Sequence, residues 1–436
     1  MRSRLLAGAV LLISGALAWL AVSSTLAARS LQVLIAISIA YVVYLAWHGW
    51  RVIRSARASA PTPPEALPWV TVVVPARDEE PVIADVVADL AAQEYADDRG
   101  PRFDVLVIDD GSADGTGGAA AAAGASLGDR FTLVRREPGS GPRTKGAALA
   151  HAHDRVRGEV VGIVDADSRL DSDYLARVIA AWQRDPGAAA IQTRRTELNR
   201  HRGWLPASQE EEHLMDLASQ CGRWATDGTA ELRGTGMFLR RAALEAVGGW
   251  NETALTEDLE ISTRLAAAGQ RVTLAPEAVI SEEAVETLTG LWRQRMRWAE
   301  GSVRRLVDIG PGLMADRRLP IGRRLDFLLF VTEFLVPPLF VATIAASLLT
   351  VALPRPADWT VPATLFVGYG LGTFLLAAAG LSATGERGPA VLLRATRGSL
   401  FLSHWLVVVP IALLLVTVDS ETTEFWRTPR SPHRDR

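Results

Sequence analysis

Long apolar runs stand near both ends of the chain, while the middle alternates between short apolar runs and polar stretches. Each of the long runs approaches or exceeds the roughly 20 residues that a membrane-spanning helix needs. The runs are Leu5–Leu26, Leu31–Trp50, Leu325–Leu353, Val361–Ala383 and Ser399–Val418. The pattern therefore predicts two spans before the central region and about three after it.

The first run has a second interpretation. Arg2 and Arg4 precede it, and the small residues Ala27 and Ala28 follow it. Such a pattern is also typical of a cleaved signal peptide. Under either interpretation, Leu31–Trp50 still anchors the central region in a membrane.

Arginines are distributed unequally between the two sides of the predicted spans. One side carries a large set, namely Arg51, Arg54, Arg57, Arg317, Arg318, Arg323, Arg324, Arg387, Arg394 and Arg397. The other side carries only Arg29 and Arg355 in its loops. Because basic residues accumulate in cytoplasmic loops, residues 51–324 are expected in the cytoplasm. Five spans would place the arginines of the C-terminal tail outside, so the number of late spans is left open.

The central region alternates between strand and helix patterns. The β-branched run Val70–Val74 is typical of a strand that is buried on both faces. Similar runs are Val105–Ile108, Phe131–Val134, Val160–Val164, Ala189–Gln192 and Val272–Ala275. Helical patterns occupy 79–93, 144–155, 171–184 and 257–268. This alternation predicts an α/β domain with a mostly parallel sheet flanked by helices.

These patterns divide the chain into five parts. We expect two transmembrane helices in 1–55, a catalytic α/β domain in 56–285, amphipathic interface helices in 286–324, about three transmembrane helices in 325–420, and a polar tail in 421–436. Prolines 61, 63, 64 and 68 predict a stiff linker between membrane and domain. The sequence predicts a multi-pass protein of the cell (inner or plasma) membrane.

Composition changes this picture little. The net charge of −3 gives no basic footprint, so no nucleic-acid partner is expected. The single cysteine, Cys221, excludes an internal disulfide and is typical of a buried small side chain. Composition does not specify an oligomeric state.

Acidic residues follow two of the predicted strands. Asp109-Asp110-Gly111 ends the second strand, and Asp165-Ala166-Asp167 ends the fourth. Ligands bind at the carboxyl ends of parallel strands. Asp165 and Asp167 therefore suit a divalent cation that also holds diphosphate oxygens. One of Asp109 and Asp110 would accept a hydrogen bond from a nucleobase or ribose. The alternative is that both segments are ordinary acidic turns.

A third acidic segment, Thr256-Glu257-Asp258, opens a predicted helix. Thr256 would serve as the N-cap residue, and acids are favoured there by the helix dipole. The functional interpretation makes Asp258 a general base that deprotonates an acceptor hydroxyl.

The segment Gln294-Arg295-Met296-Arg297-Trp298 lies in a basic amphipathic helix pattern. Gln294, Arg297 and Trp298 share one helical face because they stand at i, i+3 and i+4. Such a helix suits a membrane surface. Under the plainer interpretation it is a membrane anchor with no further role. The functional interpretation places Arg297 against diphosphate charge and Trp298 against a sugar ring.

The order of these segments resembles the processive-type family 2 glycosyltransferases, the group that includes cellulose, hyaluronan and poly-N-acetylglucosamine synthases. The segments that carry the resemblance are Val70–Glu80, Asp109–Ser112, Lys145-Gly146-Ala147, Asp165–Asp167, Gly234-Thr235-Gly236, Thr256–Asp258 and Gln294–Trp298. The resemblance implies a GT-A (Rossmann-like) fold, a UDP-sugar donor, Mg²⁺ or Mn²⁺, and inversion at the anomeric carbon.

The resemblance also assigns roles to residues. The donor-binding residues would be Pro75, Arg77, Glu79, Asp109, Asp110, Lys145, Asp165, Gln294 and Arg297. Asp167 would hold the metal together with Asp165, and Asp258 would be the base beside Glu257. The acceptor would lie on Gly234, Thr235, Gly236 and Trp298. Asp78 departs from the pattern, because many relatives carry Asn there.

The acceptor has two interpretations within this family. The segment Arg297–Ser302 resembles the bacterial lipid glucosyltransferases. We therefore expect transfer of glucose or N-acetylglucosamine to a membrane lipid. The alternative is a processive polysaccharide synthase of the poly-N-acetylglucosamine or β-glucan type, which extrudes its product.

Two interpretations outside catalysis are weaker. A nucleotide-binding pseudoenzyme is disfavoured because every carboxylate is present. A transporter is disfavoured because Glu333 and His404 are few polar groups for a transport pathway. Glu333 would contact a sugar or lipid headgroup, or pair with another helix.

Overall fold

The structure of the chain is a computed structural model that describes residues 2–59, 64, 66–316, 319–332, 334–351 and 359–418. Glu333 and the tail 421–436 lie outside these ranges. Within them the chain forms two units, and each is described by itself. The first unit contains the described residues of Met1–Arg54, Ser208–Thr229 and Thr287–Glu424, and the second those of Ser55–Ala207 and Ala230–Glu286. The expected division into five parts stays a prediction.

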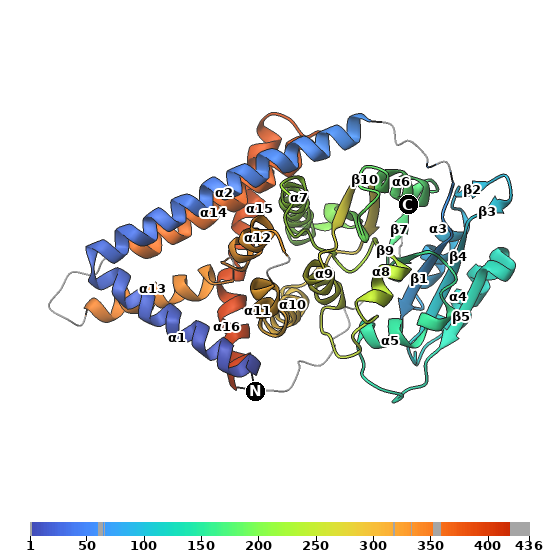
Figure 1. Ribbon diagram of the computed structural model, residues 1–436, viewed down its shortest axis with the longest axis horizontal. Coiled ribbons are helices and arrows are strands. Elements are labelled where there is room, and N and C mark those ends of the chain that lie inside the picture. The colour runs from blue at the N-terminus through green and yellow to red at the C-terminus, as the bar shows by residue number, and fades with distance from the viewer. Residues whose placement is uncertain are drawn as a thin grey trace. The chain divides into compact units, whose positions relative to one another are not determined.

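The second unit is built around an eight-stranded sheet with the strand order β5-β4-β1-β6-β9-β8-β10-β7 (Figure 1). The strands are β1 Val70–Ala76, β4 Phe103–Asp109, β5 Phe131–Arg135, β6 Val160–Ile163, β7 Arg169–Leu170, β8 Ala190–Glu197, β9 Met237–Arg240 and β10 Val272–Glu282. Two further short strands, β2 Ala96–Asp97 and β3 Gly100–Pro101, pair with each other. All six strands expected from the sequence are present.

The sheet is mixed, which corrects the expectation of a mostly parallel one. β5, β4, β1 and β6 run parallel, as do β8 and β10. The strand β9 is antiparallel to both of its neighbours, and β7 is antiparallel to β10. The sequence pattern misses β9 and β7 because such short strands give too few alternating positions for a periodic signal.

Strand residues alternate between two hydrophobic layers. Val70, Val72 and Val74 pack in one cluster of buried residues, whereas Val73 packs in the other. Since successive side chains of a strand point to opposite faces, an unbroken apolar run fills both layers. This burial is the reason why the short apolar runs predict these strands correctly.

Helices cover this sheet. They are α3 Ile83–Ala91, α4 Thr116–Gly124, α5 Lys145–His151, α6 Tyr174–Trp182, α8 Arg241–Ala246 and α9 Glu257–Ala267. Four of them lie inside the helical segments expected from the sequence, in shorter form. The expected segment 144–155 ends its α-helix early, because His153–Arg155 form a 3₁₀ turn.

Among the described residues, four helical segments are long and apolar enough to cross a membrane. They are Arg4–Ser23, Thr25–Ala58, Thr360–Ala383 and Pro389–Val418. A fifth crossing is formed if Ile321–Val331 and Val336–Val351, which meet at 43°, count as one span. In the terms of Figure 1 these segments are α1 Arg2–Ser23, α2 Thr25–Ala58, α12 Ile321–Thr332, α13 Val336–Val351, α14 Thr360–Ala383, α15 Pro389–Leu402 and α16 Trp405–Val418.

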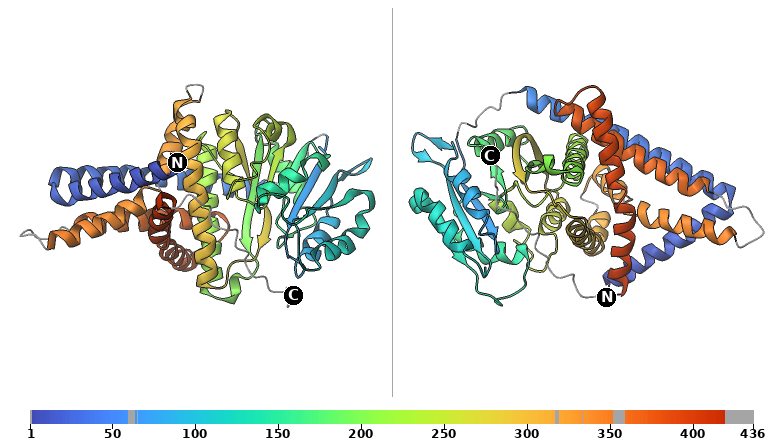
Figure 2. Two further views of the ribbon diagram at one scale, coloured as in Figure 1. Left: turned by 90° about the horizontal axis from the view of Figure 1, so that it is seen from below. Right: turned by 180° about the vertical axis from the view of Figure 1, so that it is seen from behind.

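Two boundaries differ from the expected spans. The helix α2 begins at Thr25, so the expected loop around Arg29 is helical. Arginine is a good helix former and does not end a helix by itself. The last segment begins at Pro389, about ten residues before the expected Ser399. The helix α1 packs against α13 and α16 (Figure 2).

A polar helix, α7 Trp204–Ala225, contributes its residues from Ser208 onward to the first unit. Its Glu211 and Arg223 are fully buried. Glu211 pairs with Arg394 and Arg397 of α15, and Arg223 pairs with Asp326 of α12. The sequence pattern does not predict α7, because charged and polar residues are mixed with apolar ones at its buried positions.

Glycines allow α2 and α7 to approach closely. A Cβ atom added to Gly222 would lie 2.3 Å from the carbonyl oxygen of Leu45, and one added to Gly49 would lie 2.0 Å from that of Ala218. Small residues are enriched where apolar helices pack this tightly.

We expect Gly222→Val to separate α2 from α7 and to destabilise the protein by about 1–3 kcal/mol, which is the usual range for overpacking. Thermal unfolding in detergent would measure the change. The matched control is Gly15→Val in α1, where an added Cβ meets no atom within 4 Å. Equal unfolding temperatures for both variants would contradict the close packing described for Gly222.

Candidate active site

The carboxyl end of β4 presents Asp109 and Asp110. Asp109 is buried, and its Oδ1 accepts a hydrogen bond from the amide of Ser112 at 2.9 Å. Asp110 accepts a hydrogen bond from Arg136 at 2.6 Å and lies 3.6 Å from a guanidinium nitrogen of Arg77. Arg136 is not indicated by the sequence motifs, although its position directly after β5 places it at the same edge of the sheet.

The loop after β1 holds Arg77 in place. Asp78 has a positive φ of 51°, a conformation that Asn and Asp tolerate better than most residues. Its Oδ1 accepts the amide of Ala113 at 2.7 Å, and its own amide donates to Ser112 at 3.0 Å. The aspartate therefore adopts the conformation and accepts the hydrogen bond that an asparagine would. This explains how Asp78 can stand where many relatives carry Asn. Pro75 lies within β1, and the amide of Glu79 donates to Thr116 at 2.8 Å.

Lys145, at the start of α5, brings several of the expected residues together. Its Nζ lies 2.5 Å from Oδ1 of Asp165 and 3.4 Å from Oε1 of Glu257. The same ammonium donates to the carbonyl oxygen of Gly234 at 3.1 Å. The helix that carries Lys145 is capped by Thr144, whose side chain accepts the amide of Ala147 at 3.1 Å.

The charges in this cluster compensate one another. Burial by itself would lower the pKa of Lys145, but the carboxylates of Asp165, Glu257 and Asp258 outweigh it and raise that pKa. Burial raises the pKa of Glu257, an effect that Lys145 opposes. Lys145 is therefore a fixed positive charge among three carboxyl groups.

Lys145 is also the only lysine among the 46 basic residues of the chain. This signal is present in the sequence alone. Every other cation is an arginine, whose planar guanidinium makes hydrogen bonds in a fixed fork, whereas an ammonium is a compact charge with three donors. The surroundings of Lys145, two carboxylates and one carbonyl, suit the ammonium.

The glycines of the Gly234-Thr235-Gly236 loop have positive φ angles of 78° and 66°. A Cβ atom added to Gly234 would lie 3.6 Å from Oδ2 of Asp258, so the missing side chain leaves that carboxylate accessible from the loop. Thr235 is buried, and its hydroxyl accepts the amide of Asp165 at 3.0 Å. Thr235 thus connects the loop to the segment that follows β6.

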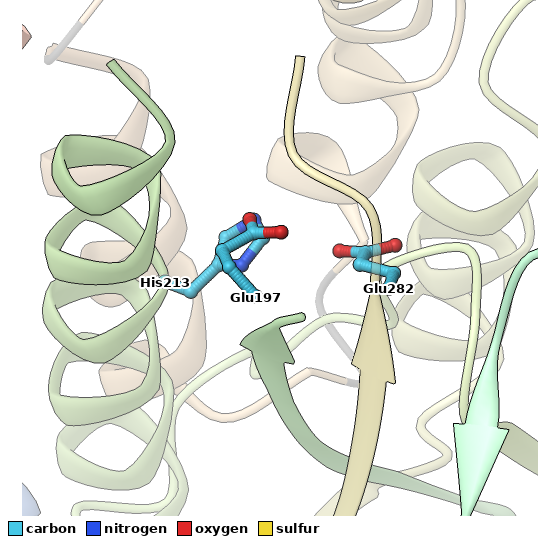
Figure 3. Close-up of side chains that lie close together, drawn as sticks. All are labelled: Glu197, His213 and Glu282. Carbon is cyan, nitrogen blue, oxygen red and sulfur yellow. The ribbon is translucent and has the colours of Figure 1, made fainter. Parts of the chain in front are cut away.

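Asp167 is buried beside the end of β10, where the amide of Glu283 lies 3.5 Å from its Oδ2. Two further carboxylates, Glu197 and Glu282, pair in register at the ends of β8 and β10 (Figure 3). The strand patterns in the sequence do not indicate them, because both strands continue beyond their expected ends. His213, also drawn in Figure 3, belongs to α7 of the first unit.

The donor set of Asp165 and Asp167 fits a hard divalent cation. Both supply carboxylate oxygens from one short segment after β6, and such oxygens are the ligands that Mg²⁺ and Mn²⁺ prefer.

The remaining expected residues lie in the first unit, on α10 Leu288–Asp308. Arg297 and Trp298 are half-buried. The Oε1 atom of Gln294 is buried and has no hydrogen-bond partner within the described ranges. Of the apolar side chains at the start of α10, Leu291 is buried whereas Trp292 is exposed.

Comparison with known protein families identifies the family of the chain. Residues 67–301 match the profile described as glycosyltransferase like family 2. The chain belongs to glycosyltransferase family 2. The family expected from the order of the motifs is thereby confirmed, and so is the prediction of an enzyme.

Named family 2 relatives include enzymes with two kinds of product. The chain is 30% identical over 398 residues to a beta-monoglucosyldiacylglycerol synthase of Synechocystis sp., covering 86% of this chain and 81% of the relative. It is 27% identical over 259 residues to a poly-beta-1,6-N-acetyl-D-glucosamine synthase of Staphylococcus aureus, covering 59% of this chain and 60% of the relative.

A solved structure shares the fold of this family 2 chain. The mannosyltransferase of Pyrobaculum calidifontis, in complex with GDP-Man and Mn²⁺, matches with a TM-score of 0.58 and 22% identity. The match covers 88% of this chain and 99% of that protein. The GT-A-like fold is therefore confirmed, with a mixed sheet in place of a mostly parallel one.

For a family 2 enzyme the solitary lysine gives a direct prediction. We expect Lys145→Arg to lower the rate of sugar transfer by about tenfold or more, because hydrogen bonds to charged groups contribute roughly 1.5–3 kcal/mol and the guanidinium cannot reproduce their geometry. Initial rates of transfer would measure it. Arg99→Lys, between β2 and β3, is the control for an arginine–lysine exchange on this chain. Wild-type rates for Lys145→Arg would contradict the need for an ammonium.

Proposed function

We propose that the chain transfers glucose or N-acetylglucosamine from a UDP-sugar to a membrane lipid of the diacylglycerol class, with inversion at the anomeric carbon. The observation that carries this proposal is the extent of the likeness to beta-monoglucosyldiacylglycerol synthase, which reaches 86% of the chain. The helices long enough to cross a membrane support a location in the cell membrane, where such an acceptor resides.

In the proposed reaction Asp258 is the general base. It takes the proton of the acceptor hydroxyl while that oxygen attacks the anomeric carbon, and the bond from this carbon to the diphosphate oxygen breaks. The products are the glycolipid and UDP. The nearness of Gly234 to Asp258 supports this role, because the missing side chain leaves room for an acceptor. Glu257, held by Lys145, orients the start of the helix that carries Asp258.

The proposed donor-binding roles are given residue by residue. Asp109 and Asp110 would hold the nucleoside, with Pro75, Arg77 and Glu79 in the adjoining loop. Lys145 and Asp165 would lie near the donor sugar, while Gln294 and Arg297 would engage the diphosphate. Asp165 and Asp167 would hold Mg²⁺ or Mn²⁺, which when bound neutralises charge on the diphosphate. The unpartnered Oε1 of Gln294 supports a ligand at that side chain.

A second candidate function is a processive polysaccharide synthase. It is supported by the likeness to poly-beta-1,6-N-acetyl-D-glucosamine synthase, which covers 59% of the chain. Because the likeness to the lipid glucosyltransferase extends further along the chain, we rank the lipid acceptor first.

A transfer assay distinguishes the two functions. Purified protein in lipid vesicles that contain diacylglycerol would receive Mn²⁺ and radiolabelled UDP-glucose, UDP-N-acetylglucosamine or UDP-galactose. Label that enters the organic phase at one sugar per lipid is the expected result. Label in a water-insoluble polymer that a glycosidase degrades would favour the synthase. No transfer from any donor would contradict both functions and favour a pseudoenzyme.

A further inference from the structure

A buried arginine of α10 lies between two tryptophans of the first unit. Arg295 is 1% exposed. Its guanidinium carbon lies 4.1 Å from the ring centroid of Trp298, one turn further along α10, and 5.7 Å from that of Trp405 on α16. Cations at these distances are attracted by the face of an indole ring.

One carboxylate holds this arrangement together. Oε2 of Glu212, on α7, accepts a hydrogen bond from Nη2 of Arg295 at 2.5 Å. Oε1 of the same side chain accepts one from the indole nitrogen of Trp405 at 3.0 Å. The two oxygens of Glu212 thus fix the cation and one of its flanking rings, and the cation in turn contacts Trp298.

The chemistry of the cluster points to positioning rather than to stability. Burying an ion pair costs a desolvation penalty that its attraction often fails to exceed, and apolar side chains would pack α7, α10 and α16 without that penalty. Buried ion pairs do serve in some proteins to select one arrangement of the side chains around them. Arg295 stands three residues before Trp298, the spacing that places two side chains on one helical face.

We propose that the Glu212–Arg295 ion pair is a positioning device that fixes the indole of Trp298 for stacking on the acceptor. The proposal rests on the proposed function, in which Trp298 contacts the acceptor. Arg295 is then a positioning residue that acts through Trp298. Its loss should weaken acceptor binding while the UDP-sugar still binds normally.

Kinetics of Arg295→Met give the first measurement. The acceptor KM, measured against diacylglycerol in mixed micelles, should rise about tenfold, because a desolvated cation–π contact corresponds to a factor of roughly 10–30 in affinity. The donor KM should change by less than about twofold, since the contact between Arg295 and Trp298 has no part in the proposed donor binding. Arg293→Met, an exposed arginine of the same helix, is the control. Arg295→Lys, which keeps the charge beside Glu212, should recover part of the loss.

A single substitution at this position can impair folding, because it leaves the partly buried Glu212 charged and without Arg295. The double variant Glu212→Gln, Arg295→Met removes both charges, and the Gln carbonyl still accepts from Trp405. We expect this double variant to fold and to show the same rise in acceptor KM. A normal acceptor KM in the folded double variant would overturn the proposal.

NMR spectroscopy distinguishes the positioning of Trp298 from its proposed contact with the acceptor. In protein labelled with 5-fluorotryptophan, the ¹⁹F resonances of Trp298 and Trp405 should move in Arg295→Met, whereas that of Trp182, whose flanking cation is Arg240, should not. An unmoved Trp298 resonance would overturn the proposal whatever the activity. If the resonance moves but Trp298→Leu leaves the acceptor KM unchanged, the ion pair does position Trp298, and the acceptor contact in the proposed function is wrong.

Discussion

Replacing Asp258 by Asn should lower the turnover number of sugar transfer by about 10²–10⁴-fold, the usual contribution of a general base, while the UDP-sugar still binds. The amide keeps the size of the side chain beside Gly234 but cannot accept the proton of the acceptor hydroxyl. Turnover would be measured at saturating donor and acceptor. Calorimetric titration with UDP would measure the retained binding.

The neighbouring helix positions provide the control for this variant. Glu260, on the same helix, pairs with Arg264 at 2.7 Å and has no part in the proposed reaction. Glu260→Gln should leave turnover within about twofold, because the amide keeps the size of the side chain and Glu260 takes no part in proton transfer. Full activity of Asp258→Asn would mean that another group removes the proton.

Asp167→Ala should abolish transfer together with its dependence on Mg²⁺ or Mn²⁺. We expect a loss of about 10³-fold or more, because the charge stabilisation supplied by a catalytic metal ion is worth several kcal/mol. Asp167 is buried and comes from the same short segment as Asp165, so no exposed side chain is expected to replace it. Activity against Mn²⁺ concentration, with Mn²⁺ binding followed by electron paramagnetic resonance, would measure both losses.

An aspartate outside the site is the matched control for this second substitution. Asp173 precedes α6 and pairs with Arg177 at the surface. Asp173→Ala should keep both activity and Mn²⁺ binding. If Asp167→Ala bound Mn²⁺ with wild-type affinity, the assignment of the metal ligands to the segment after β6 would be wrong.

The strands of the second unit were predictable because burial on both faces leaves continuous apolar runs. Val70–Val74 is such a run apart from Thr71, and its valines fill two hydrophobic layers. β9 gave no comparable signal, since its four residues are too few for a pattern. α7 gave none for a different reason: the partners that compensate its buried charges, such as Arg394 and Asp326, lie far along the chain.

The candidate site was predictable where its residues follow strands. Asp109, Asp110, Asp165 and Asp167 all stand at or just after the carboxyl ends of β4 and β6, and parallel strands bring such ends to one edge. Lys145 was identified only through the resemblance to family 2. Glu212 and Arg136 were missed, because each gains its role from a tertiary contact that spacing along the chain does not indicate.

The solitary lysine also allows the candidate active site to be cut or labelled selectively. An endoproteinase that cuts after lysine has one target in the whole chain, the bond between Lys145 and Gly146. An amine-reactive ester has the same side chain and the terminal amine as its targets. Because the ammonium is held by Asp165 and Glu257, both reagents should act only when that cluster opens. The rate of cutting or labelling therefore measures how often the Lys145 cluster opens, in the native enzyme and without any engineered probe.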